Sequence, residues 1–197
     1  MHAPAQPAAK LDPARGWWLR ALLVLQSPRP VFAALRDDSD EAARARQEPV
    51  AALVALAGIS RVLATPVARR LANTPDYDAL LIAVWAFIGG VIYAIFVYWV
   101  LGAILYGVTH ALGSLGSYRR ARHLVAFAVA PLVLALVVYW PLRIGVYGID
   151  LFRTGGDDFG TGDAVFGWIF VAFVAWAAAL LALGVRTVHG WSWPRSR

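Results

Sequence analysis

The sequence contains no cysteine among its 197 residues. Disulfides, thiolate nucleophiles, iron–sulfur clusters and cysteine-ligated zinc are therefore excluded. The sequence also has no glycine-rich phosphate loop, no H-E-x-x-H zinc motif and no nucleophile elbow. Because no side chain is nominated as a nucleophile with an adjacent base, we expect a protein that is not an enzyme and that binds no cofactor and no catalytic metal.

Charged residues are also scarce, at 15% of the chain, whereas 60% of the residues are hydrophobic and the mean hydropathy is +0.61. The extreme case is the run from Ala79 to Tyr118, which is forty residues long, has no charged side chain and is followed at once by Arg119, Arg120 and Arg122. A run of this length is too apolar for the core of a soluble chain of this size. The sequence therefore predicts an integral membrane protein.

The formal net charge is +6, and the basic residues sit in short clusters beside apolar runs. This arrangement is typical of membrane topology signals and of contacts with anionic lipids. We therefore expect the lipid bilayer to be a partner of this protein, and we do not expect nucleic acid to be one.

The composition divides the chain into four parts. Residues 1–14 are rich in proline and alanine and are expected to form a disordered N-terminal tail. Residues 15–48 are expected to be cytoplasmic, with interfacial helices and a charged linker, because Trp17 and Trp18 begin an apolar run that is too short to span a bilayer. Residues 49–190 are expected to form the transmembrane domain, and residues 191–197 a basic C-terminal tail.

The number of membrane crossings depends on the charge-free run. As one helix it would be about 60 Å long, about twice the hydrocarbon thickness, so it crosses once with a surplus or twice with a deficit. A single crossing gives four spans and puts thirteen Lys and Arg residues on the N-terminal side against four opposite, whereas a hairpin gives nine against eight. The positive-inside rule thus favours four spans with both termini in the cytoplasm, in the cell (inner or cytoplasmic) membrane.

The predicted fold class is accordingly an all-α, polytopic transmembrane helical bundle, preceded by an N-terminal interfacial amphipathic helix. The third span is expected to end at Trp140 and Pro141, which suit a membrane interface. A fifth span is possible between residues 140 and 152, but Arg143 and Asp150 make that segment a poor one.

Arg61 is the candidate polar site within the membrane, because it falls in the first apolar span near Ser60 and Thr65. An intramembrane cation can belong to a substrate or proton path, but we favour a structural role in which the side chain pairs or reaches towards water. Combined with the glycine and tyrosine faces of the long span, Arg61 supports an alternative function as a small permease or channel.

Four acidic residues, Asp150, Asp157, Asp158 and Asp163, lie in a glycine-rich segment that could attract a hard cation such as calcium. Their spacing fits no calcium-loop template. We therefore favour a solvated turn and predict no metal site.

Several segments together resemble the Yip1 family of small polytopic membrane proteins, in particular its bacterial members. These segments are SPRPVFAAL (Ser27 to Leu35), GSLGSYRR (Gly113 to Arg120), AFAVAPLVLAL (Ala126 to Leu136) and ALGVRTVHGWS (Ala182 to Ser192). The resemblance implies a helical bundle with a cytoplasmic N-terminus and, in eukaryotic members, association with small GTPases and a role in membrane trafficking. The family is usually described with five spans, one more than the charge distribution favours here.

The resemblance and the lack of catalytic motifs lead to one functional expectation. We expect a non-enzymatic membrane protein that acts through a protein partner, through homo-oligomerisation or by organising its membrane. The candidate cytoplasmic interaction surface comprises Trp17, Trp18, Arg119, Arg120 and Arg122.

Overall fold

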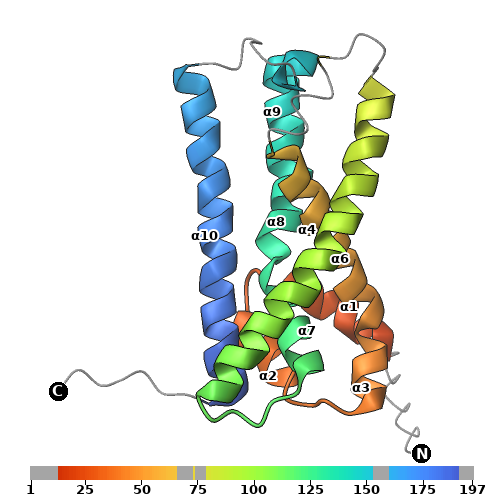
Figure 1. Ribbon diagram of the computed structural model, residues 1–197, viewed down its shortest axis with the longest axis vertical. Coiled ribbons are helices and arrows are strands. Elements are labelled where there is room, and N and C mark those ends of the chain that lie inside the picture. The colour runs from red at the N-terminus through yellow and green to blue at the C-terminus, as the bar shows by residue number, and fades with distance from the viewer. Residues whose placement is uncertain (1–12, 66–72, 74–78, 153–159, 191–197) are drawn as a thin grey trace, which may run out of the picture.

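The computed structural model describes residues 13–65, 73, 79–152 and 160–190, and within these residues it contains helices and no strand. Four antiparallel passes form the body of the molecule: α4 (Gln47–Leu63), α6 (Ala79–Ala111), a broken helix that begins with α7 (Tyr118–Ala128), and α10 (Thr161–His189). The predicted all-α bundle is thus confirmed. Three short helices, α1 (Pro13–Leu23), α2 (Pro28–Ala34) and α3 (Asp40–Ala45), gather at the end where α7 begins and α10 ends (Figure 1).

Three helices in the described part of the chain are long and apolar enough to cross a membrane, namely Leu80–Ala111, Tyr118–Tyr147 and Thr161–His189. The charge-free run is one of them and forms a single continuous helix instead of a hairpin. Helix α4 makes the fourth pass beside α6, but its 17 residues extend only about 25 Å, less than the hydrocarbon thickness.

Helices α1 and α2 form where the sequence predicts short helices. The chain turns at Ser27, and Pro28 and Pro30 then occupy the first turn of α2, where a missing N–H is tolerated. The two helices pack their inner faces against the bundle through fully or nearly fully buried side chains: Trp17, Ala21, Val24, Val31, Phe32 and Leu35. Four large apolar side chains of α1 point outward and are exposed, Trp18, Leu19, Leu22 and Leu23, as expected of a helix at a membrane interface.

The segment from Asp37 to Glu48, which was expected to be a charged linker, instead forms α3 and the first turn of α4. The Ser39 hydroxyl caps α3 by accepting a hydrogen bond from the Ala42 N–H at 3.3 Å. Asp40 and Glu41 lie in the first turn, where negative charge stabilises a helix. The linker therefore folds because it carries its own helix start signal.

The pass that begins with α7 continues through α8 (Ala130–Leu134), the π-helical turn η1 (Ala135–Tyr139) and α9 (Trp140–Tyr147), and it ends in the 3-10 turn η2 (Gly148–Phe152). The expectation that this span ends at an interface at Trp140 was wrong. Trp140 is only 2% exposed, and its indole N–H donates to the Ser60 carbonyl at 3.1 Å and lies 3.2 Å from the Ser60 hydroxyl. The helix continues past Pro141 because this proline lies in the first turn of α9 after the π-helical turn, where no regular helical bond is lost. No fifth pass occurs among the described residues.

Glycines allow α4 and α6 to approach closely. A Cβ atom added to Gly90 would lie 2.6 Å from the Ile59 Cα, and one added to Gly58 would lie 2.3 Å from the Gly90 carbonyl oxygen. Helices in membranes associate through such close contacts, since burial from lipid supplies little driving force. Gly89, the neighbour of Gly90, has no atom within 4 Å of an added Cβ and serves no packing role.

This difference gives a matched test of the α4–α6 contact. Gly90→Ala should lower the free energy of unfolding by about 1–3 kcal/mol, because the backbone of α4 must move away. Gly89→Ala should leave stability unchanged or raise it by up to about 1 kcal/mol through helix propensity. Unfolding by SDS titration in mixed micelles measures both. Equal stability of the two variants would contradict the proposed close packing.

Candidate functional site

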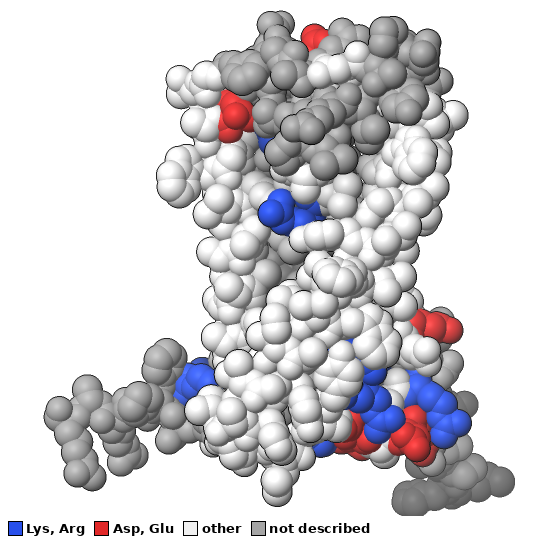
Figure 2. Space-filling model, viewed as in Figure 1, with Lys and Arg blue, Asp and Glu red and all other residues white. Residues whose placement is uncertain are grey.

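The charged side chains concentrate at the end of the bundle that carries α1, α2, α3, the 112–117 turn, the start of α7 and the last turn of α10. We call this end the polar cap. Figure 2 shows Arg and Asp or Glu side chains side by side at this lower end, below a middle zone that is almost entirely uncharged. The cap therefore holds most of the charged side chains from which a binding site could be built.

Arg46, between α3 and α4, is the most buried charged residue of the cap, with no exposed surface. Its guanidinium lies 3.2 Å from the Asp38 carboxylate and donates to the Asp37 carbonyl at 2.7 Å and to the His123 Nδ1 at 2.7 Å. The indole of Trp17 lies on it at 5.5 Å. Burial lowers the pKa of Arg46, and the neighbouring Asp38 carboxylate opposes that shift.

Asp38 connects Arg46 to α7. Its carboxylate is 3.2 Å from the Nε of Arg119 and also accepts a hydrogen bond from the Ser117 hydroxyl, which caps α7. Arg119 forms a second ion pair, at 2.6 Å, with Asp40. The hydrogen bond from Arg119 lowers the pKa of the Asp40 carboxyl below its ordinary value of 3.8. These contacts join segments that are about eighty residues apart in the sequence.

Helix α10 is attached to the same cap. The Nε of Arg36 donates to the Thr187 carbonyl at 3.1 Å, and Arg120 in turn donates to the Arg36 carbonyl at 3.0 Å. The Ser114 hydroxyl lies 2.8 Å from the Nδ1 of His189. The cap thus connects all four passes and the N-terminal helices into one unit.

The five residues of the predicted interaction surface do not form one surface. Trp17 lies in the core, 5% exposed, because the inward face of α1 packs against α2, α3 and α4, and its ring lies 5.6 Å from that of Phe127 in α7. Trp18 is 43% exposed on the opposite face of α1. Arg119 and Arg120 are hydrogen-bonded within the cap, whereas Arg122 packs among aromatic rings. Sequence reasoning did not single out Asp38 or Arg46, and the only available signal was the charged run that contains them.

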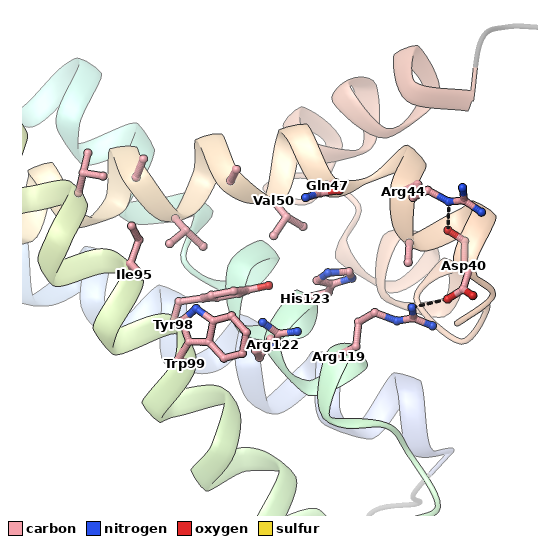
Figure 3. A pocket seen from close by; sticks show the side chains of 15 residues that line it. Asp40, Arg44, Gln47, Val50, Ile95, Tyr98, Trp99, Arg119, Arg122 and His123 are labelled. Carbon is pink, nitrogen blue, oxygen red and sulfur yellow. Dashed lines mark hydrogen bonds and ion pairs between the residues drawn. The ribbon is translucent and has the colours of Figure 1, made fainter.

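A pocket of about 960 Å³ opens between α3, α4, α6 and α7 (Figure 3). Its lining changes character along its length. Charged and polar side chains from α3, the start of α4 and α7 surround one end, and small or aliphatic side chains of α4 and α6 surround the other. Such a pocket can hold an amphiphile.

Arg61 lies in the last turn of α4, not in its middle, and it is exposed. It lines a smaller pocket of about 200 Å³ together with Tyr93 and Tyr98 and otherwise apolar residues. No hydrogen bond or ion pair joins Arg61 to any described residue. The structural pairing that we favoured for it is therefore not found there, and its long side chain remains able to reach the opposite end of the bundle.

At that opposite end, Asp163 of α10 pairs with Arg143 of α9 beside a cluster of aromatic rings around Tyr139. Asp157 and Asp158 lie outside the described residues. Among the residues that are described, no group of three or more His, Asp or Glu side chains is arranged to hold a metal ion.

The buried ion pair of the cap yields a test. Asp38→Asn leaves the fully buried Arg46 without its carboxylate and should lower the free energy of unfolding by about 3 kcal/mol. Glu41→Gln, an exposed substitution in the neighbouring helix, should change it by less than about 0.5 kcal/mol. SDS titration of both variants decides the matter: if Asp38→Asn is as stable as Glu41→Gln, the network does not hold the cap together.

Comparison with known proteins agrees with this architecture. A family model of the Yip1 domain matches residues 22–197, from the last residues of α1 through all four passes. No match was found among curated proteins or among solved structures. The match covers most of the chain, including all four passes and the cap from α2 onward, so the chain belongs to the Yip1 domain family.

Proposed function

We propose that this protein is a non-enzymatic membrane protein whose polar cap lies in the cytoplasm and acts by binding a protein partner or by organising the surrounding membrane. The observation that carries the proposal is the network of Arg46, Asp38 and Arg119, which fixes the polar helix α3 against α7 at one end of a membrane bundle. A prebuilt, rigid surface reduces the entropy cost of binding. Glu41 of α3 is exposed and has no hydrogen bond or ion pair with any described residue, so it is available to a partner.

The distribution of arginine supports a cytoplasmic cap. Most arginines among the described residues lie in the helices of the cap or next to them: Arg15, Arg20, Arg29, Arg36, Arg44, Arg46, Arg119, Arg120, Arg122 and Arg186. Arg61, in the last turn of α4, and Arg143 of α9 lie away from the cap. Positive charge in short segments near membrane-crossing helices is retained on the cytoplasmic side.

The outer face of α1 supports contact between the cap and the bilayer. Leu22 is 71% exposed and Leu19 51% exposed, next to the exposed Trp18. A short helix that is apolar on its outer face, with Arg20 beside its tryptophans, is stabilised at the level of the lipid headgroups. The cap would therefore rest on the membrane surface with α3 and the α2 end available to a partner.

Labelling of single cysteines tests the orientation directly, because the chain has no native cysteine. Leu115, which is 99% exposed in the turn of the cap, and Thr161, exposed at the start of α10, are suitable positions. We expect Leu115→Cys to react with a membrane-impermeant maleimide only after the cytoplasmic side is opened, and Thr161→Cys to react in intact cells. Labelling of both from the same side would refute the antiparallel arrangement, and the reversed pattern would refute a cytoplasmic cap.

Photo-crosslinking in cells tests for the partner. A photoreactive amino acid at Glu41 in α3 should give a discrete protein adduct, and the same group at Thr161 should not, because only the former lies on the cap. The adduct should be lost in the Asp38→Asn background, in which α3 is released. An adduct with a second copy of the chain would identify the partner as a homo-oligomer. Identical adducts at both positions, in cells where deletion changes neither membrane composition nor morphology, would count against the proposal.

A further inference from the structure

Arg122 of α7 is a cation that pairs with no anion among the described residues. No hydrogen bond or ion pair joins it to any described residue, and its Nε is buried without a partner. Its guanidinium is instead held by three aromatic rings, at 3.8 Å from the Trp99 ring centre, 4.8 Å from that of Tyr118 and 5.5 Å from that of Tyr98. In Figure 3 no interaction with a labelled side chain is drawn to it, although it lines the large pocket.

The position of Arg122 is set by the packing of α7 on α6. A Cβ atom added to Gly102 would lie 2.3 Å from the Arg122 Cγ, so only glycine at this position leaves room for the side chain. Stacking on aromatic faces fixes the plane of a guanidinium while its N–H groups stay available for an anion. Arg122 is thus oriented before any ligand binds.

The acidic residues nearby are already engaged. Asp38 is shared by Arg46 and Arg119, and Asp40 pairs with Arg119. Arg44 uses its Nε to donate to the Asp40 carbonyl at 3.2 Å and has no carboxylate of its own among the described residues. The charged end of the pocket, lined by Arg44, Arg119, Arg122 and the single acid Asp40, therefore has an excess of positive charge.

The other end of the pocket is apolar. Helices α4 and α6 are antiparallel (Figure 1). The pocket wall therefore extends away from the cap along Val50 to Val54 of α4 and along Ile95 to Val91 of α6. From Trp99 to Val91 this wall is about 12 Å long. It belongs to a helix that is long and apolar enough to cross a membrane, so its chemistry suits an acyl chain.

From this arrangement we propose that the pocket between α4, α6 and α7 binds one anionic phospholipid, with its phosphate on Arg122 and an acyl chain along the Val54 and Ile95 wall. Charge complementarity selects the headgroup, and the apolar wall distinguishes a lipid from a free phosphate or a phosphopeptide. Planar guanidinium groups bind phosphate oxygens through paired, charge-assisted hydrogen bonds. The site does not depend on a protein partner at the cap.

Native mass spectrometry of the full-length protein in detergent tests this site. The protein is equilibrated with equal amounts of phosphatidylglycerol and phosphatidylcholine that have the same acyl chains. We expect one retained phosphatidylglycerol per chain, in preference to phosphatidylcholine. Arg122→Gln should reduce its retention about tenfold, the scale of one charge-assisted hydrogen bond. Arg29→Gln, an exposed arginine of α2 outside the pocket, should retain it like the unaltered protein.

A second variant acts on the apolar wall and does not depend on whether Arg122→Gln folds. Ala51→Trp fills the groove on α4 but keeps every cation, and it should also reduce phosphatidylglycerol retention. Excess glycerol 3-phosphate should not displace the bound lipid. The proposal is overturned if the unaltered protein retains both lipids equally, if Arg29→Gln loses as much as Arg122→Gln, or if Ala51→Trp retains the lipid and glycerol 3-phosphate displaces it.

Discussion

The fully buried guanidinium of Arg46 constrains the whole lower half of this molecule. A cation removed from water is tolerated only when acceptors surround it, and here three residues supply them: Asp37 and Asp38 before α3, and His123 on α7. The hydrogen bonds and the ion pair that Arg46 forms therefore fix the N-terminal helices against the third pass. Because Asp38 also binds Arg119 and Ser117, the same interaction sets where α7 begins.

A different kind of contact holds the membrane-embedded half. Burial of apolar surface contributes little to helix association there, because the surrounding lipid is also apolar. Helix α4 is joined to its neighbours by close backbone contact at Gly58 and Gly90 and by the hydrogen bond from Trp140 to Ser60. Helix α10 contacts α2, α7 and α8, and most of its surface is left to lipid. The polar cap is consequently held by ion pairs and hydrogen bonds, whereas the bundle presents a largely apolar exterior to the bilayer.

The proposed lipid site lies where these two halves meet. Arg119 and Arg122 are only three residues apart and thus lie on nearly the same face of α7, yet they have opposite surroundings. Arg119 forms ion pairs with two carboxylates, whereas Arg122 forms none with the described residues and stacks on Trp99. The shortage of acids at the cap therefore leaves one preoriented cation directly above an apolar wall, which is the chemistry of a phospholipid at a membrane surface.

The sequence by itself determined the features that depend on local composition: an all-α membrane protein, a single helix in the run after Ala79, the break before Pro28 and the short helix α1. Hydropathy and proline positions predict these features because each feature depends on residues that are close together in the sequence. It did not reveal that Trp17 is buried, that Trp140 lies inside a helix, or that the linker after Asp37 folds. Only the tertiary structure decided which arginine meets which acid, since ion pairing depends on the distance between segments far apart in the chain, and local pattern does not encode that distance.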